Sequence, residues 1–209
     1  MKTGQKPGTR TEQPDETRAL ARRALRRQGI ERRMALTAEA HETLSAKLCE
    51  RLRESFPELA AMRVAFCWPV KNEPDLRPLM QAWLAEGNAA FAALLPVVVD
   101  PGSPLVFRCW TPQSAMTIDR YGIPTPTAGA LMPPDAVLIP VNAFDAEGYR
   151  LGYGGGFFDR TLAALQPAPL AIGVGFELAR VASIHPEAHD VRLDAIVTEA
   201  AVLRPGTIR

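Results

Sequence analysis

Residues 139–160 read IPVNAFDAEGYRLGYGGGFFDR, and four of the five positions from 152 to 156 are glycine. The apolar residues before the loop predict a strand over 137–139, and the aromatic pair after the glycines predicts the start of a helix. A strand, a glycine-rich loop and a helix start make a cradle for anions, because backbone N–H groups approach phosphate oxygens where no Cβ intervenes. This segment predicts an α/β fold with a phosphate site in the loop.

The loop does not follow the two commonest phosphate motifs. It lacks the Gly-Lys-Ser/Thr ending of a Walker A loop, and its glycine spacing differs from the dinucleotide fingerprint. A tightly packed glycine turn is the alternative interpretation. Arg150, Asp159 and Arg160 favour phosphate and Mg²⁺ chemistry, because guanidinium groups pair with phosphate and carboxylates bind Mg²⁺.

Helical and strand patterns alternate on both sides of this loop. The apolar spacing predicts helices over 17–34, 38–56, 76–84 and 157–165. Apolar runs predict strands over 64–68, 89–99, 105–110, 137–139, 170–176 and 195–198. Alternating strands and helices imply a single α/β domain over 17–209, with helices layered around a largely parallel open sheet.

Local signals set several boundaries. Gly29 is a candidate break in the first helix, Thr37 is the predicted N-cap of the second, and Asp75 is a candidate cap of the third. Trp83 lies at helical spacing with leucines and is predicted to be a core residue. Residues 1–16 contain almost no apolar side chains, so we expect a flexible tail there.

The charge is nearly balanced but unevenly distributed. The chain has 24 Lys and Arg against 23 Asp and Glu, a formal net charge of +1, which excludes a nucleic-acid polycation. Ten of the basic residues lie within 1–33, beside only four acids. A module that binds RNA through this basic helix stays as an alternative, although no aromatic residues interleave its arginines to make a stacking surface.

Cysteine and histidine usage points away from disulfides and zinc. Cys49, Cys67 and Cys109 are odd in number and form no Cys-x-x-Cys pair, so we expect buried thiols in a reducing, cytoplasmic compartment. His185 and His189 do not form a His-Glu-x-x-His motif, and we expect ordinary loop histidines. No secretory signal or membrane-spanning run is recognisable, so no membrane partner is expected.

The glycine segment also carries a resemblance. From residue 144 it reads Phe-Asp-x-x-Gly-x-Arg-Leu-Gly-x-Gly-x-Gly, followed by two aromatics, Asp and Arg. This pattern resembles the signature of the 5-formyltetrahydrofolate cyclo-ligase family, also called 5,10-methenyltetrahydrofolate synthetase. Further segments are similar in the same order and extend the resemblance over about residues 18–199: 22–26, 32–39, 68–75, 110, 121–124, 172–176 and 189–194.

The resemblance implies a ligase of one-carbon metabolism, with ATP as co-substrate and Mg²⁺ as cofactor. Such an enzyme closes 5-formyltetrahydrofolate, with or without a polyglutamate tail, to 5,10-methenyltetrahydrofolate and releases ADP and phosphate. The formyl carbon is a poor electrophile, and phosphorylation of its oxygen creates a leaving group that attack by N10 can displace. We expect a monomer that binds this small molecule and no nucleic acid.

The resemblance also implies roles for individual residues. Arg150 and Asp159 are the residues expected to be catalytic, and Asp159 and Asp194 are the expected Mg²⁺ ligands. The residues expected to bind ATP are Arg22, Arg26, Arg150, Leu151, Gly152, Tyr153, Gly154, Gly155, Gly156, Phe157 and Phe158. The residues expected to bind the folate are Trp68, Glu73, Trp110, Tyr153 and Phe157.

Three positions depart from the family pattern. Arg22 stands where Lys is common, Phe157 and Phe158 replace a frequent Tyr-Tyr pair, and Thr125 stands where an acid is frequent. The phenylalanines keep stacking but lose the phenolic hydroxyl groups. These departures leave open a second hypothesis, in which the same ATP and Mg²⁺ site serves another N-formyl or amide-like substrate.

Overall fold

The computed structural model describes residues 14–206, and its centre is a seven-stranded sheet in the order β11-β10-β9-β6-β1-β2-β3. The five inner strands are parallel, and β3 and β11 pair antiparallel at the two edges. This arrangement confirms the predicted largely parallel open sheet. The strands are β1 (Arg63–Ala65), β2 (Ala92–Val97), β3 (Val106–Cys109), β6 (Ala136–Pro140), β9 (Leu170–Val174), β10 (Ala195–Val197) and β11 (Val202–Leu203).

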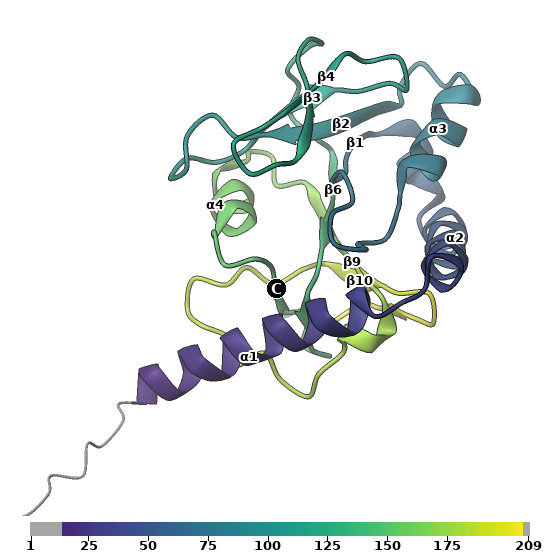
Figure 1. The fold of residues 1–209 in the computed structure, drawn as a ribbon. Coiled ribbons are helices and arrows are strands. Elements are labelled where there is room, and N and C mark those ends of the chain that lie inside the picture. Colours follow the sequence, from purple (N-terminus) through teal and green to yellow (C-terminus); the bar gives the residue numbers. More distant parts are fainter. Residues whose placement is uncertain (1–13, 207–209) are drawn as a thin grey trace, which may run out of the picture.

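Helices cover both faces of the sheet (Figure 1), because the inner strands are apolar on both sides. On one face, α2 (Ala38–Ser55) and α3 (Arg77–Ala85) pack against alternate residues of the strands, such as Leu138 of β6. On the other face, Leu162 of α4 (Phe157–Ala164) packs with Val137 and Ile139. The result is three layers, with the predicted core residue Trp83 buried in the first of them.

Two helix starts can be compared with the predictions. Thr37 is the N-cap of α2, and its hydroxyl oxygen accepts a hydrogen bond from the backbone N–H of Ala40 at 3.1 Å, as predicted. The predicted cap of α3 is wrong, because the helix begins at Arg77 with Leu76 as its N-cap. Asp75 instead accepts hydrogen bonds from both the backbone and the guanidinium of Arg77.

The first helix, α1 (Pro14–Met34), runs past Gly29 without interruption, so the candidate break at this glycine is wrong. A Cβ added to Gly29 would lie 1.7 Å from the carbonyl oxygen of Asn142, just after β6. This glycine therefore serves close helix packing rather than helix termination. The helix also takes in residues 14–16 of the predicted tail, and the rest of that tail lies outside the described residues.

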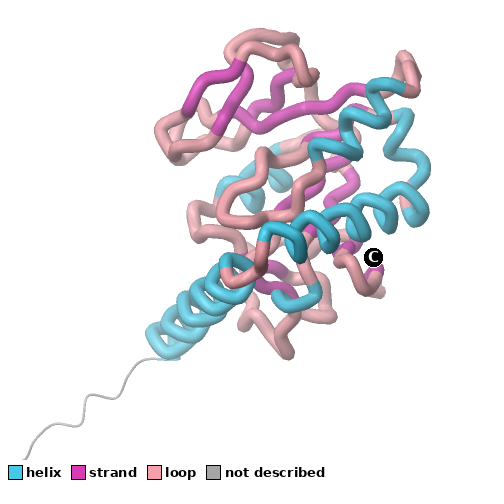
Figure 2. Tube along the Cα trace, turned by 45° about the vertical axis from the view of Figure 1, so that its right-hand side comes forward, coloured by secondary structure: helices cyan, strands magenta, loops and turns pink. Residues whose placement is uncertain are grey.

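Several short elements were not expected. An antiparallel ribbon of β4 (Met116–Ile118) and β5 (Pro124–Pro126) lies within the Pro-rich part of the chain, and a second pair, β7 (Ala143–Phe144) and β8 (Arg150–Leu151), precedes the glycine-rich loop. Figure 2 shows α1 projecting along one end of the molecule, away from the β4–β5 ribbon. Two short 3-10 helices, η1 (Pro57–Ala61) and η2 (Glu177–Ala179), complete the described elements.

Candidate active site

The glycine-rich loop connects β8 to the first turn of α4. Gly154 and Gly156 adopt φ angles of +93° and +64°, in the left-handed region where a Cβ is strained. Gly154 and Gly155 are exposed, so their backbone is open to solvent. An exposed, glycine-rich backbone at a helix start can donate N–H groups to phosphate oxygens.

A cleft of 470 Å³ opens between α1 and this loop. Arg22 and Arg26 line it from the helix, and Tyr153 and Gly154 line it from the loop. The Nε of Arg26 donates to the carbonyl oxygen of Gly152 at 3.2 Å, across 126 residues of sequence. The tertiary structure thus brings together the two segments that the resemblance assigns to ATP.

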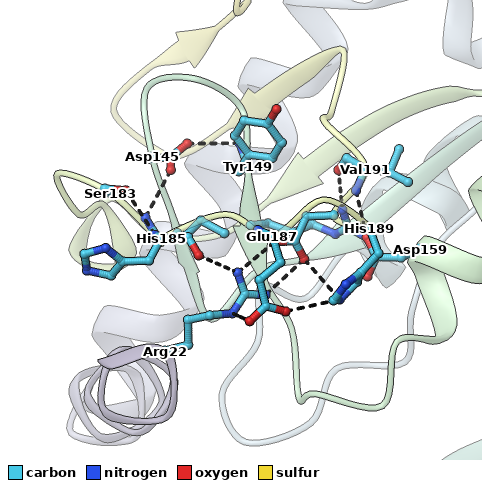
Figure 3. Close-up of polar contacts among 12 residues, drawn as sticks. Arg22, Asp145, Tyr149, Asp159, Ser183, His185, Glu187, His189 and Val191 are labelled. Atoms are coloured by element: carbon cyan, nitrogen blue, oxygen red, sulfur yellow. Dashed lines mark hydrogen bonds and ion pairs between the residues drawn. The ribbon is translucent and has the colours of Figure 1, made fainter. Parts of the chain in front are cut away.

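Arg22 is already committed to a buried ion pair (Figure 3). Its Nη1 and Nη2 donate to the two carboxylate oxygens of Asp190 at 2.7 and 3.0 Å, and Nη1 also donates to the carbonyl oxygen of His185 at 2.9 Å. Glu187 lies 3.9 Å from its Nε. Only 5% of Arg22 is exposed, so its guanidinium holds the loop that carries His185 and Asp190.

Arg26 differs from Arg22 in the number of guanidinium nitrogens that are free to bind a ligand. Burial tends to lower the pKa of Arg22, but Asp190 outweighs it and raises that pKa. Burial and the neighbouring charge of Arg22 lower the pKa of Arg26. Within the described residues, the Arg26 side chain makes one hydrogen bond, through Nε. Its two terminal nitrogens are therefore available to an anion in the cleft. Arg26 is therefore the better placed of the two to bind phosphate.

Arg150 and Asp159, the two residues to which the resemblance gives a catalytic role, form an ion pair. The Nη2 of Arg150 lies 3.1 Å from Oδ1 of Asp159, and its Nη1 donates to the carbonyl oxygen of Val191 at 2.9 Å. The backbone N–H of Val191 donates to the same carboxylate oxygen at 3.2 Å (Figure 3). Burial lowers the pKa of Arg150, against the opposing charge of Asp159. The Arg150 side chain is buried, so the pair joins β8, α4 and the 180–192 loop.

Asp194, the other expected metal ligand, lies directly before β10. Its Oδ2 accepts a hydrogen bond from the backbone N–H of Ala171 at 2.8 Å, which ties the beginnings of β9 and β10 together. No hydrogen bond or acidic cluster joins Asp194 to Asp159, and residues 14–206 contain no group of three or more His, Cys, Asp or Glu placed for a metal ion. A Mg²⁺ ion that is also coordinated by ATP phosphates needs only one or two protein carboxylates. Asp159 fits this need better than Asp194, because its second carboxylate oxygen, Oδ2, accepts no hydrogen bond within the described residues.

Glu73 is buried between α1 and the glycine-rich loop, with 2% of its surface exposed. Its Oε1 accepts a hydrogen bond from the hydroxyl of Tyr153 at 2.9 Å, and its Oε2 accepts one from the backbone N–H of Val70 at 3.1 Å. Arg33 lies 3.8 Å away. Burial raises the pKa of Glu73, although Arg33 and Tyr153 oppose the shift. Two of the expected folate residues therefore meet here.

Sequence reasoning left out Arg33 and Asn142, which belong to the same cluster. The Nη1 of Arg33 donates to Oδ1 of Asn142 at 3.0 Å, and both side chains are buried. The Nδ2 of Asn142 has no partner among the described residues. The sequence held one signal for Arg33. It follows Gly29 by four positions, so the two residues lie on the same face of the helix, the face that packs against the domain.

Trp68 and Trp110 meet in a different cavity, of 280 Å³. Their ring centroids are 6.4 Å apart, and the guanidinium of Arg77 lies 4.6 Å from the Trp68 ring. Glu73 does not line this cavity. Of the five expected folate residues, Glu73 and Tyr153 therefore meet in one cluster, Trp68 and Trp110 meet in another cavity, and Phe157 lies in neither.

The remaining loop residues have mixed environments. The ring of Phe157 contacts that of Tyr121 at 5.7 Å and the guanidinium of Arg160 at 5.2 Å. Phe158 packs partly against the core on the α4 face. Leu151 is 1% exposed, and its carbonyl oxygen accepts a hydrogen bond from the backbone N–H of Asn142 at 2.8 Å, so this residue is not open to the cleft.

Comparisons with known proteins agree with this architecture. Residues 18–199 match the model of the 5-formyltetrahydrofolate cyclo-ligase family. The chain is 31% identical over 179 residues to the 5-formyltetrahydrofolate cyclo-ligase of Escherichia coli K12, covering 82% of this chain and 97% of that protein. It is 26% identical over 181 residues to the Mycoplasma pneumoniae protein of the same name, covering 86% and 99%.

Solved structures give the same result. The 5,10-methenyltetrahydrofolate synthetase of Aquifex aeolicus superposes with a TM-score of 0.75 at 30% identity, covering 90% of this chain and 94% of that one. The Mycoplasma pneumoniae synthetase, at 24% identity and a TM-score of 0.67, shares the fold over 85% of this chain and 98% of its own. None of the helices within residues 14–206 has the length and apolar character of a membrane span.

Proposed function

The chain belongs to the 5-formyltetrahydrofolate cyclo-ligase family, and from this premise we propose that it cyclises 5-formyltetrahydrofolate to 5,10-methenyltetrahydrofolate at the expense of ATP. The observation that carries the proposal is the cleft in which Arg26 meets the exposed glycine backbone. A guanidinium with free donors beside open N–H groups suits a triphosphate.

The chemistry consists of two displacements. The formyl oxygen attacks the γ-phosphorus of ATP, and the bond to the β,γ-bridging oxygen breaks, which releases ADP. N10 then attacks the activated formyl carbon, the carbon–oxygen bond breaks with loss of phosphate, and the N10 proton leaves to solvent. Positioning and charge stabilisation supply most of the catalysis in such phosphoryl transfers.

Different residues of this chain are proposed to bind the phosphates, to position the loop beside them and to hold Mg²⁺. Arg26 and the backbone of residues 152–156 bind the phosphates, and Arg22 holds the loop beside them through Asp190. Asp159, steadied by Arg150, would hold Mg²⁺, which when bound neutralises phosphate charge. Asp194 is the second proposed ligand, although its contact with Ala171 favours a structural contribution.

Glu73 is the proposed contact for the donor edge of the pterin. Its carboxylate has a lone pair left on each oxygen after the bonds from Tyr153 and Val70. Trp68 and Trp110 offer aromatic surface in the adjoining cavity for the rest of the folate. Binding of polyglutamylated folate, a monomeric state and a cytoplasmic location stay predictions.

The test is the near-ultraviolet absorbance of the protein mixed with 5-formyltetrahydrofolate, Mg²⁺ and ATP at mildly acidic pH, where the methenyl product persists. We expect a rise in absorbance that requires all three components. A flat trace from folded protein that binds ATP would reject the folate reaction. In that case, ADP release with other N-formyl substrates would test the alternative that the departures at Thr125, Phe157 and Phe158 leave open.

The RNA-binding alternative is less well supported. Arg22 and Arg33 of the basic helix are buried against the domain, and Arg26 bonds to the glycine-rich loop. These side chains are therefore not part of a free basic surface. Loss of RNA binding on removal of residues 1–33, with a folate-independent ATPase activity left intact, would favour this alternative instead.

A further inference from the structure

We infer that Arg33 is a positioning residue, which holds the Tyr153 hydroxyl on Glu73 and so couples the nucleotide loop to the folate site. This inference rests on the proposed function, because it takes Glu73 as the folate acid and the glycine-rich loop as the nucleotide site. In this proposal Arg33 acts through Tyr153 and Glu73 and not on either ligand directly.

The guanidinium of Arg33 is fixed from three directions. Nε donates to the carbonyl oxygen of Lys71 at 2.8 Å, Nη1 to Oδ1 of Asn142 at 3.0 Å, and Nη2 to the hydroxyl oxygen of Tyr153 at 3.0 Å. Only 3% of Arg33 is exposed. A buried planar group with three directional bonds has little freedom, so it fixes the position of the tyrosine hydroxyl.

Tyr153 connects the buried Glu73 to the exposed glycine-rich loop. Its hydroxyl donates to Oε1 of Glu73 at 2.9 Å, while 48% of the residue is exposed and its neighbours Gly152 and Gly154 belong to the glycine-rich loop. Tyr153 also lines the cleft beside Arg26. One residue thus contacts Glu73 through its hydroxyl and borders the proposed nucleotide cleft.

This connection couples the two ligands energetically. An exposed glycine-rich loop loses conformational entropy when phosphate orders it. Because Tyr153 belongs to that loop, a nucleotide that orders the loop also restricts the tyrosine ring, whose hydroxyl Arg33 aligns with Glu73. A folate that binds afterwards meets a prearranged acid and therefore binds more tightly.

The charged groups around Glu73 come from several elements. Arg33 reaches it from α1, Tyr153 from the glycine-rich loop and Lys71 from its own loop, and all three favour the carboxylate. The Cys67 thiol also faces it, and the His41 ring of α2 contacts its backbone carbonyl oxygen at 2.7 Å. Burial is already the largest effect on the pKa of Glu73 and raises it, so loss of the Arg33 and Tyr153 contacts would raise that pKa further.

The test is the affinity of the full chain for 5-formyltetrahydrofolate, measured with and without a non-hydrolysable ATP analogue and Mg²⁺. For the wild type we expect the analogue to tighten folate binding at least about fivefold, within the usual range of coupling between sites. Folate must tighten binding of the analogue by the same factor, since coupling is reciprocal. Tyr153→Phe keeps the half-exposed ring and is expected to bring the factor close to one.

Two further variants complete the design. Arg33→Lys keeps the charge but cannot make the bonds to Lys71, Asn142 and Tyr153 from one planar group, and is expected to reduce the coupling factor as Tyr153→Phe does. Arg27→Gln on the same helix, where 70% of the arginine side chain is exposed, is the matched control and should keep the wild-type factor. Thermal unfolding of each protein checks that it is folded.

The outcomes separate this inference from the proposed function. Coupling that disappears in Tyr153→Phe and persists in Arg27→Gln supports the inference. If both ligands bind to the wild type but coupling is absent, or persists unchanged in Tyr153→Phe, the inference is wrong and the proposed function stands. Failure of the wild type to bind 5-formyltetrahydrofolate at all rejects the proposed function and this inference with it.

Discussion

Gly29 of α1 lies directly against the backbone of Asn142, so closely that a Cβ on this glycine would sit 1.7 Å from the Asn142 carbonyl oxygen. The contact lets the helix approach the end of β6. One helical turn later, Arg33 reaches Oδ1 of the same asparagine and then Tyr153. The absence of one side chain thus sets the position of the charged residues that follow it.

Gly29→Ala is expected to destabilise the protein by about 1–3 kcal/mol, as overpacked cores do. The sign of the change in the free energy of unfolding is informative. Alanine is the better helix former by about 1 kcal/mol, so the same substitution would stabilise the protein at an exposed helical site. Thermal or urea unfolding measures the change. Gln28→Ala, at the exposed neighbouring position, is the control and should be neutral or slightly stabilising. A stable Gly29→Ala protein would contradict the close packing.

Asp190→Asn tests the buried ion pair. Burial opposes ionisation of Asp190, but hydrogen bonds from Arg22 and the Glu187 amide outweigh it and lower its pKa. Its contribution to stability is therefore complete above the ordinary pKa of about 3.9 and is lost as the pH falls through the lower folded value. We expect a loss of about 3 kcal/mol at pH 7 that shrinks below about pH 4.

The matched control for that pair is Asp15→Asn. Asp15 contacts Arg18 on the same helix, but 85% of its side chain is exposed. An exposed ion pair contributes less than about 1 kcal/mol, so this variant should unfold almost as the wild type does. Equal effects of the two substitutions would mean that burial of the Arg22 pair does not matter.

Glu73→Gln is expected to weaken folate binding more than ATP binding. Burial raises the pKa of Glu73, so the carboxylate form is lost as the pH falls through a value above the ordinary Glu pKa of about 4.3. In the wild type, kcat/KM for folate should fall with pH in that region, when measured by ADP release. The variant should lack this acid limb. Equal losses of folate and ATP affinity would count against a pterin contact.

Arg26→Gln is expected to raise the KM for ATP about tenfold, because one charge-assisted contact to phosphate is worth about 1.5–3 kcal/mol. Steady-state kinetics with saturating folate measures it. Arg27→Gln removes a mostly exposed guanidinium one residue away and should leave KM unchanged. An unchanged KM in Arg26→Gln would remove this residue from the nucleotide site.

Asp159→Asn is expected to slow turnover about 100-fold while folate binding survives, because a neutral amide is a poor Mg²⁺ ligand. Asp194→Asn separates two roles. Loss of its bond to Ala171 should lower the melting temperature. A higher Mg²⁺ concentration for half-maximal activity in Asp194→Asn would instead establish it as a metal ligand. Near-normal turnover in Asp159→Asn would exclude Asp159 as a Mg²⁺ ligand.

The sequence by itself determined the sheet class, the main helices and the glycine-rich loop. These features depend on residues that are close in sequence. Apolar periodicity and cap residues such as Thr37 act on the backbone conformation of their immediate neighbours. The β4–β5 ribbon was missed because prolines and short strands carry little periodic signal. Gly29 was misread because its local helix penalty is visible in the sequence, whereas its contact with Asn142 is not.

Only the tertiary structure decided which of the predicted site residues meet. It paired Arg22 with Asp190 across 168 residues, joined Glu73 to Tyr153 across 80, and separated both from the Trp68 cavity. Arg33 looked like any other arginine of a basic helix until the fold buried it. Such long-range contacts depend on how closely whole elements pack, and packing that excludes water from both groups makes a polar contact between them stronger.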